Sequence, residues 1–228
     1  MCNSACILFG EVHLSRDEVM GKKVIEVGAV NVNGSLRASI EALQPLSYLG
    51  VDISEGPGVD EKCDINDLIE HYGKESFDVV VSAEVMEHVR NWRSAVSNMK
   101  NILKPNGVLI LTTRSKSFPY HGYPFDFWRY EVEDMLVIFS DFLIEALEKD
   151  PLSPGVFVKA RKPAVFCEQN LERYSLFSIV RDRPCRELQP WDILLFKTKR
   201  LVRSLLSKTL PAQVKAKVKR MMCRAKGA

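Results

Sequence analysis

Short apolar runs alternate along the chain with segments whose apolar residues recur at helical spacing. The runs have the lengths of buried parallel strands and cover residues 23–27, 48–53, 77–82 and 108–112. Helical patterns are expected between them, over residues 35–43, 65–72 and 92–103. This alternation predicts βαβ units and an α/β fold with a Rossmann-like, doubly wound, mostly parallel sheet.

Two further apolar runs predict how the sheet ends. Residues 142–147 and 156–160 flank a Pro- and Gly-containing turn at 150–155, which is typical of a final antiparallel hairpin. After Ala164 the composition changes. We therefore expect one domain over residues 1–163, a linker or covering segment over 164–190, and a basic helical tail over 191–228.

The tail has an amphipathic pattern. Its apolar residues follow helical offsets from Leu194 to Leu206, and a second basic stretch at 214–224 follows Pro211. The segment from Trp191 to Ala228 holds eleven Lys and Arg against one acid, so it carries +10 of a net charge of +3 and leaves the rest of the chain at −7. Three interpretations stay open, namely packing on the domain, peripheral association with an anionic membrane, and RNA binding, for which no recognised module is present.

Composition narrows the class of protein. The six cysteines are scattered without a CxxC pair, which favours reduced thiols and a cytoplasmic location. No metal centre is predicted. No apolar run approaches 18 residues, so no transmembrane span is expected.

Candidate binding residues follow the predicted strands. In open parallel sheets, ligands bind outside the carboxyl ends of the strands. Gly28 follows the predicted strand at 23–27, Asp52 ends the one at 48–53, and Ser82 and Glu84 lie at the end of the one at 77–82, while Asp64 precedes a helix. Each has a structural alternative, because a lone glycine fits any βα turn and an aspartate often caps a helix.

These ordered motifs resemble the class I S-adenosylmethionine (SAM)-dependent methyltransferases, in particular the small-molecule branch called methyltransferase type 11. The matching stretches are VIEVGA, YLGVDIS, CDINDL and the run from Phe77 to Thr113 with its EHV step and LKPxG turn. The resemblance implies a seven-stranded sheet, SAM as cofactor, and a cofactor site that contains Glu26, Gly28, Ala29, Asn31, Gly34, Asp52, Ile53, Asp64, Ile65, Ser82 and Glu84.

The glycine loop departs from the family pattern. Val30 and Val32 occupy positions where such loops carry glycine, and branched residues require negative φ in practice. We expect the loop to take a different path, in which Asn31, Asn33 or Gly34 supplies the contacts. A nicotinamide dinucleotide is disfavoured, because the fingerprint G-x-G-x-x-G is absent.

The segment RSKSFPYHGYPFDFWRY, residues 114–130, is rich in aromatic and polar side chains. In the resembled family this region forms part of the acceptor pocket, and a similar pattern occurs in members linked to glycan and polar-lipid pathways. We expect His121 to act as a base and Asp126 to assist. His88 is either a wall of the cofactor site or a base. Alternatively, the aromatic residues form a packed lid, with Arg129 paired to Asp126 or Glu131.

The expected function is methyl transfer from SAM to a small-molecule or glycan/lipid-linked acceptor at oxygen. The alternatives are an RNA or protein methyltransferase that docks its substrate on the basic tail, and a catalytically silent Rossmann-like binding module. After the predicted strand at 77–82 the sequence reads Ser82 to Val85, without an Asn-Pro-Pro or Pro-Cys motif. This disfavours base-amine and cytosine C5 methylation. The sequence does not define the oligomeric state.

Overall fold

The structure is a computed structural model that describes residues 3–122 and 125–209. The chain divides into two compact units, Met1–Glu187 and Leu188–Ala228. The first contains both sheets and six of the α-helices.

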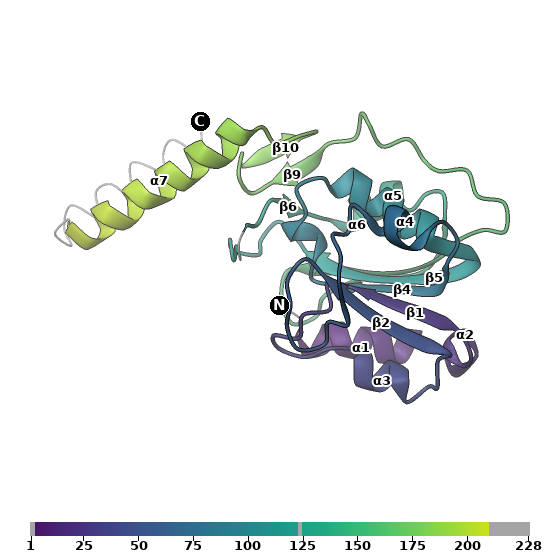
Figure 1. Cartoon of the computed structure of the whole chain (residues 1–228). Coiled ribbons are helices and arrows are strands. Elements are labelled where there is room, and N and C mark those ends of the chain that lie inside the picture. The colour runs from purple at the N-terminus through teal and green to yellow at the C-terminus, as the bar shows by residue number, and fades with distance from the viewer. Residues whose placement is uncertain (1–2, 123–124, 210–228) are drawn as a thin grey trace. The chain divides into compact units, whose positions relative to one another are not determined.

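A seven-stranded sheet forms the centre of the first unit (Figure 1). Its strands are β1 (Lys23–Val27), β2 (Ser47–Asp52), β3 (Glu61–Lys62), β4 (Phe77–Ala83), β5 (Leu103–Arg114), β7 (Leu143–Lys149) and β8 (Gly155–Arg161). The order is β3-β2-β1-β4-β5-β8-β7, with parallel pairing up to β5 and antiparallel pairing of β8 with both β5 and β7. The predicted doubly wound sheet with a final antiparallel hairpin is confirmed.

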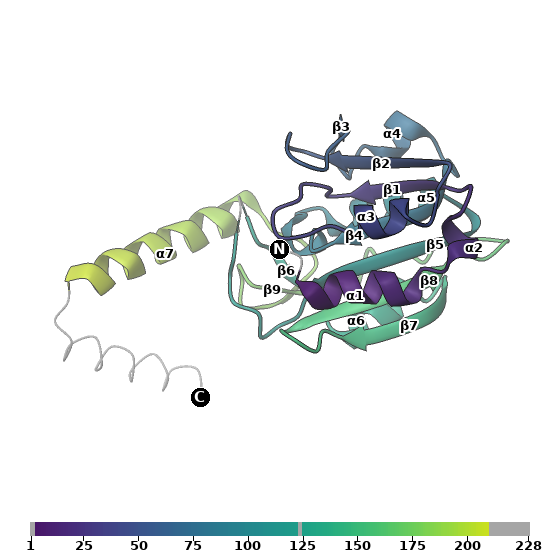
Figure 2. The same ribbon diagram turned by 90° about the horizontal axis from the view of Figure 1, so that it is seen from below.

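Helices cover both faces of this sheet (Figure 2). One face carries α1 (Ser4–His13) and α3 (Arg37–Glu41), and the other carries α4 (Leu68–Tyr72), α5 (Trp92–Ile102) and α6 (Val132–Ile138). A short α2 (Arg16–Val19) precedes β1. The pattern of the sequence did not predict α1 and α2.

Two helices begin later than the sequence predicts. Before α3, the Ser35 hydroxyl donates to Glu26 and accepts from the backbone N–H of Arg37. Before α4, the Asp64 carboxylate accepts from the backbone N–H of Asn66. Such local bonds compete with the first helical turn, and both helices are consequently short.

The core beneath α1 follows the alternation of the strands. Val24, Val79, Val81 and other residues of the central strands point to this face and pack with residues of α1 and α3. Phe9 of α1 lies at the centre of the contact, its ring centroid 5.3 Å from that of Phe157 on β8. Burial of this apolar face holds the N-terminal helix on the sheet.

A second, three-stranded sheet joins the segment after residue 163 to the first unit. It contains β6 (Trp128–Arg129), β9 (Leu176–Ser178) and β10 (Arg183–Cys185) in the order β10-β9-β6. The Arg93 guanidinium of α5 also donates to the carbonyls of Leu171, Tyr174 and Arg186. Residues 164–187 are thereby attached to both α5 and the 114–130 segment.

The second unit contains one described helix, α7 (Pro190–Thr209), at the position of the predicted amphipathic helix. The predicted break at Pro211 and the basic stretch at 214–224 lie outside the described residues. Within the part of the chain that the structure describes, no helix is long and apolar enough to cross a membrane.

Candidate active site

The first strand ends in a turn that only glycine can form. Gly28 has φ +84°, and a Cβ at this position would stand 2.0 Å from Cγ2 of Val85. The backbone N–H groups of Gly28 and Ala29 both donate to the Val51 carbonyl of β2. The missing side chain therefore lets the side chain of Val85, which follows β4, pack directly on the backbone at the end of β1.

The remainder of the loop accommodates its two valines without strain. Among residues 28–34, positive φ occurs at Gly28 and Gly34 alone, so Val30 and Val32 have negative φ, as predicted. The side-chain oxygen of Asn31 accepts from the Gly34 N–H at 2.9 Å, and the backbone N–H of Asn31 donates to the Pro57 carbonyl. Asn31 thus shapes the turn that replaces the glycine-rich path.

Glu26 lies beneath this loop rather than in an open crevice. Its buried carboxylate accepts from the Tyr48 hydroxyl at 2.6 Å and from the Ser35 hydroxyl at 3.3 Å. Burial raises the pKa of Glu26, against the effect of these two hydrogen bonds. In this arrangement Glu26 joins β1, β2 and the start of α3.

The second strand end presents a partly exposed carboxylate. Asp52 accepts from the backbone N–H groups of Ser54 at 2.9 Å and Val30 at 3.4 Å, while Ile53 beside it is exposed. Asp64 is exposed and forms a local turn with Asn66, whereas Ile65 is buried. The structure thus brings Asp52 next to the glycine loop. Asp64 does not cap a helix, which was its structural alternative, because α4 begins at Leu68 with Asp67 at its N-cap.

The end of β4 carries two buried polar groups. The Ser82 hydroxyl is buried without a hydrogen-bond partner. Glu84 follows with φ +61°, a conformation that is costly for a residue with a side chain. The buried hydroxyl without a partner fits a ligand that has polar groups and lies across the strand ends.

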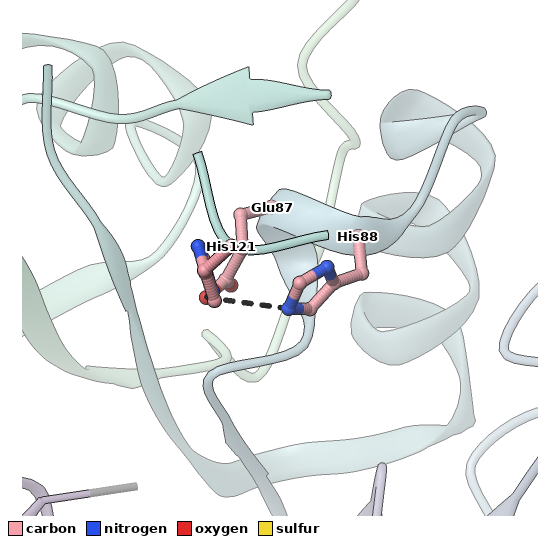
Figure 3. Close-up of side chains that lie close together, drawn as sticks. All are labelled: Glu87, His88 and His121. Carbon is pink, nitrogen blue, oxygen red and sulfur yellow. Dashed lines mark ion pairs between the residues drawn. The ribbon is translucent and has the colours of Figure 1, made fainter. Parts of the chain in front are cut away.

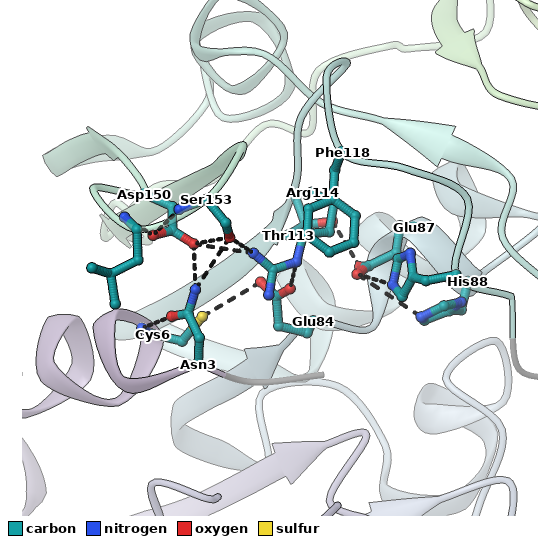
Figure 4. Close-up of polar contacts among 12 residues, drawn as sticks. Asn3, Cys6, Glu84, Glu87, His88, Thr113, Arg114, Phe118, Asp150 and Ser153 are labelled. Atoms are coloured by element: carbon teal, nitrogen blue, oxygen red, sulfur yellow. Dashed lines mark hydrogen bonds and ion pairs between the residues drawn. The ribbon is translucent and has the colours of Figure 1, made fainter. Parts of the chain in front are cut away.

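The Glu84 carboxylate belongs to a buried charge network (Figure 4). It is paired with the Arg114 guanidinium of β5 and accepts from the Cys6 thiol at 3.6 Å. Arg114 also donates to Asp150 at 3.0 Å, and the Asn3 amide donates to the same carboxylate at 2.7 Å. Burial and the neighbouring Glu87 raise the pKa of Glu84 well above its ordinary value, against the effect of Arg114.

Next to this network, three chemically active side chains face one another (Figure 3). Glu87 and His88 come from the short 3₁₀ turn Met86–His88 after β4, and His121 comes from the loop after β5. Oε1 of Glu87 lies 3.5 Å from Nε2 of His121 and 3.9 Å from Nε2 of His88. The sequence interpretation missed Glu87, although its place beside His88 in the EHV step was a usable signal.

Charge holds His121 in its protonated form. Asp126 lies 3.0 Å from Nδ1 of His121, on the side of the ring opposite Nε2, which faces Glu87. Burial acts to lower the pKa of His121, but the two carboxylates raise it to about 9. The Glu87 pKa falls to about 2, because the contact with His121 and the charge of His88 outweigh burial.

Asp126 itself is buried behind His121. Both of its oxygens accept from the fully buried Arg129, at 2.5 and 2.7 Å, and Arg129 also donates to backbone carbonyls of Phe118, Pro119 and Trp128. The expected alternative pairing of Arg129 with Asp126 is therefore present. Since Asp126 is covered, it positions His121 and does not face an acceptor directly.

The contact of His88 fixes the position of its ring proton. Nδ1 lies 2.5 Å from the Phe125 carbonyl, and because a carbonyl only accepts, Nδ1 donates. The other ring nitrogen, Nε2, faces Oε1 of Glu87 at 3.9 Å. The three ligand atoms of Glu87, His88 and His121 lie within 4.8 Å of one another, so this set could receive either protons or a metal ion.

Comparisons with known proteins agree with this geometry. A family model described as "Methyltransferase domain" matches residues 12–149. The ubiquinone biosynthesis O-methyltransferase of Haemophilus ducreyi is 25% identical over 178 residues, which is 71% of this chain and 69% of that protein. The range of the family model includes the ends of β1, β2 and β4.

Solved structures share the fold. A SAM-dependent methyltransferase from Mesorhizobium loti aligns with a TM-score of 0.55 at 19% identity, over 70% of this chain and 99% of that chain. The Burkholderia thailandensis 1,6-didemethyltoxoflavin-N1-methyltransferase, solved with S-adenosylhomocysteine, aligns with a TM-score of 0.53 at 14% identity, over 71% and 80%.

The family match and the strand-end geometry lead to one assignment. Gly28, Asp52 and Ser82 lie at the carboxyl ends of β1, β2 and β4, the edge of an open parallel sheet at which ligands bind. The chain belongs to the methyltransferase domain family, and it is a SAM-dependent methyltransferase of class I with a Rossmann-like fold.

Proposed function

We propose that this enzyme methylates a hydroxyl oxygen of a small-molecule acceptor, with His121 accepting the hydroxyl proton. The observation that carries the proposal is the juxtaposition of Glu87, His88 and His121 directly after the end of β4. The name of the Haemophilus ducreyi relative, an O-methyltransferase, supports oxygen as the methylated atom. Glycan and lipid-linked hydroxyl acceptors are included in the proposal.

We assign the cofactor contacts to the residues at the strand ends. Gly28 and Ala29 place the loop backbone at the end of β1, Asp52 suits the two ribose hydroxyls, and Ser82 supplies a buried hydroxyl. Asp64 and Ile65 are assigned to the adenine side, Ile53 to its apolar cover, and Asn31 and Gly34 to the reshaped loop. Glu26 and Glu84 act through the groups that they hold, since both carboxylates are buried.

The proposed reaction needs a destination for one proton. When bound, SAM supplies an electrophilic methyl carbon, and each transfer to a hydroxyl releases one proton. His121 takes this proton only in its neutral form. Because its pKa is raised to about 9 in the free chain, the neutral form is a minority at neutral pH. A protonated His121 also attracts an acceptor oxyanion, so acceptors with acidic, phenol-like hydroxyls suit the site best.

Aromatic rings provide the surroundings of this proton site. Phe118 packs edge-on against His121 at 4.8 Å between centroids, and His88 contacts the same ring at 4.8 Å from another side. Phe125 stacks on Phe127 at 5.5 Å. Such surfaces favour a planar or ring-shaped acceptor with a hydroxyl at its edge.

The proposal is tested by a screen of phenols, catechols, sugars and polyprenyl phenols with labelled SAM. With the best acceptor, His121→Gln should lower kcat by at least about 100-fold and leave the dissociation constant of SAM unchanged. His71→Gln, which changes an exposed histidine of α4, is the matched control. Turnover of His121→Gln within twofold of wild type would refute the role of His121, and methylation confined to nitrogen would refute the acceptor class.

Two arms separate the competing interpretations. A chelator that abolishes turnover, with recovery on adding one divalent metal, would assign Glu87, His88 and His121 to a metal rather than to protons. Failure to bind SAM in calorimetry would favour a silent binding module. Methylation of RNA or protein with no small-molecule turnover would favour the alternative that uses the basic tail.

A further inference from the structure

Helix α7 has an apolar face that is exposed between residues 191 and 205. Five aliphatic residues of this face are between 47% and 66% exposed: Leu194, Leu195, Leu201, Val202 and Leu205. Trp191 at the start of the helix is 61% exposed. At 100° per residue these side chains fall within an arc of roughly 140°, in which Thr198 is the single polar member over residues 191–205.

Basic side chains border this arc on both sides. Lys199 lies along one edge and Lys197 along the other, while Arg200 and Arg203 lie on the opposite face. All four are exposed. A lysine beside an apolar face can extend its ammonium group away from it while its methylenes stay in apolar contact.

We propose that α7 is a membrane-surface anchor that lies in the headgroup region of an anionic bilayer. Its leucine face would enter the acyl boundary, and its lysines and arginines would contact lipid phosphates and carboxylates. The sequence beyond the described helix adds further Lys and Arg, giving +10 between Trp191 and Ala228. RNA would be served by the charge but would leave the leucine face without a partner.

The inference is independent of the catalytic cluster. The family match ends at residue 149, and α7 belongs to a compact unit that begins at Leu188. A failure of the acceptor proposal therefore leaves this one intact, and a failure of membrane binding leaves catalysis intact.

The experiment is co-sedimentation of the full chain with vesicles of phosphatidylcholine alone or with about 30 mol% phosphatidylserine. Binding is expected only with the anionic vesicles and should weaken as salt is raised. Lys197→Gln with Arg200→Gln should reduce the partition constant about fivefold for each residue. Leu201→Gln with Leu205→Gln should reduce it at least about tenfold without any change of charge. Ser204→Gln, on the polar face, is the matched control and should bind as wild type does.

Fluorescence gives a second readout from one residue. Trp92 and Trp128 are 1% and 0% exposed, so an emission shift to the blue on adding vesicles reports Trp191. Trp191→Phe should remove the shift while retaining most of the sedimentation. Absence of binding to anionic vesicles would overturn the proposal. Three results with the leucine variant would also overturn it. These are vesicle binding equal to that of wild type, a fall in the Tm of the vesicle-free chain larger than that of Ser204→Gln, and a loss of affinity for RNA instead of vesicles.

Discussion

Nε2 of His121 lies 3.5 Å from Oε1 of Glu87, which joins the loop after β5 to the turn after β4. The Glu87 carboxylate is fully buried, and Thr113 donates to its second oxygen at 2.9 Å. A buried carboxylate of this kind requires a cation, and His121 supplies it. The pair therefore couples the protonation of the proposed base to the stability of the site.

Turnover should depend on pH through His121. Since its pKa is about 9, kcat should rise between pH 7 and 9 as the neutral imidazole accumulates. Asp126→Asn removes one of the two carboxylates that raise this pKa, so the midpoint should move toward the ordinary value of 6.5. Steady-state kinetics at saturating SAM measure both profiles. Identical profiles for wild type and Asp126→Asn would contradict this assignment.

Stability should fall at alkaline pH. The folded pKa of His121, about 9, lies above its ordinary value of 6.5, so the ion pair contributes its full stabilisation below about pH 6.5 and loses it as the pH rises through 9. The pKa of Glu87, about 2, lies below its ordinary value of 4.5, so acid removes the contribution as the pH falls from 4.5 toward 2. Thermal unfolding from pH 6 to about 10 should show a steeper loss of Tm in wild type than in His121→Gln.

Gly28→Ala should impair both folding and cofactor binding. A Cβ there meets Val85 at 2.0 Å, and φ +84° is itself unfavourable for alanine, so a loss of about 2–4 kcal/mol of unfolding free energy is expected. Calorimetry should show at least about tenfold weaker SAM binding. Gly73→Ala, with φ +76° but no contact closer than 3.7 Å, is the control and should lose less stability with unchanged affinity. Equal affinities for SAM would exclude Gly28 from the cofactor site.

Val30→Gly should weaken SAM binding, although it restores the usual family residue. Val30 lies against Gly56, where an added Cβ would stand 3.3 Å from its Cγ1, and its N–H donates to Asp52 at 3.4 Å. Glycine would loosen this packing. It would also raise the conformational entropy of the unfolded loop, which disfavours the ordered loop by about 0.5–1 kcal/mol. Val32→Gly, which changes an exposed residue of the same loop, is the comparison. Tighter SAM binding by Val30→Gly would show that the valine hinders the cofactor.

Asp126→Ala should destabilise the domain strongly. The substitution leaves the fully buried Arg129 without its paired carboxylate, and a loss of about 3–5 kcal/mol in the free energy of unfolding is expected. Asp126→Ala with Arg129→Met removes the charge as well and should recover much of the loss. Denaturant unfolding of wild type, Asp126→Ala, Arg129→Met and the double variant measures this directly. If the double variant lost as much unfolding free energy as the two single variants together, Asp126 and Arg129 would not stabilise the fold through their contact.

The sequence predicted six strands of the central sheet, but it predicted neither β3 nor the environments of the polar residues. Runs that are mostly apolar, such as Phe77–Ala83, identify buried parallel strands. The α1 helix was missed because its short sequence contains a glycine, Gly10, that packs against Leu36. The pairing of Glu84 with Arg114 could not be predicted either, since it depends on the contact of two strand ends and on a left-handed turn.

The network around Arg114 also constrains how the chain can fold. Asn3 bonds to Asp150, 147 positions further along, and Cys6 reaches Glu84 after an interval of 78. Contacts of such separation form after the local ones, because the closure of long loops is entropically costly. Asn3, at the N-cap of α1, is synthesised before the β7–β8 hairpin and reaches Asp150 only when that hairpin has been made. Completion of the charge network is therefore expected to be a late step of folding.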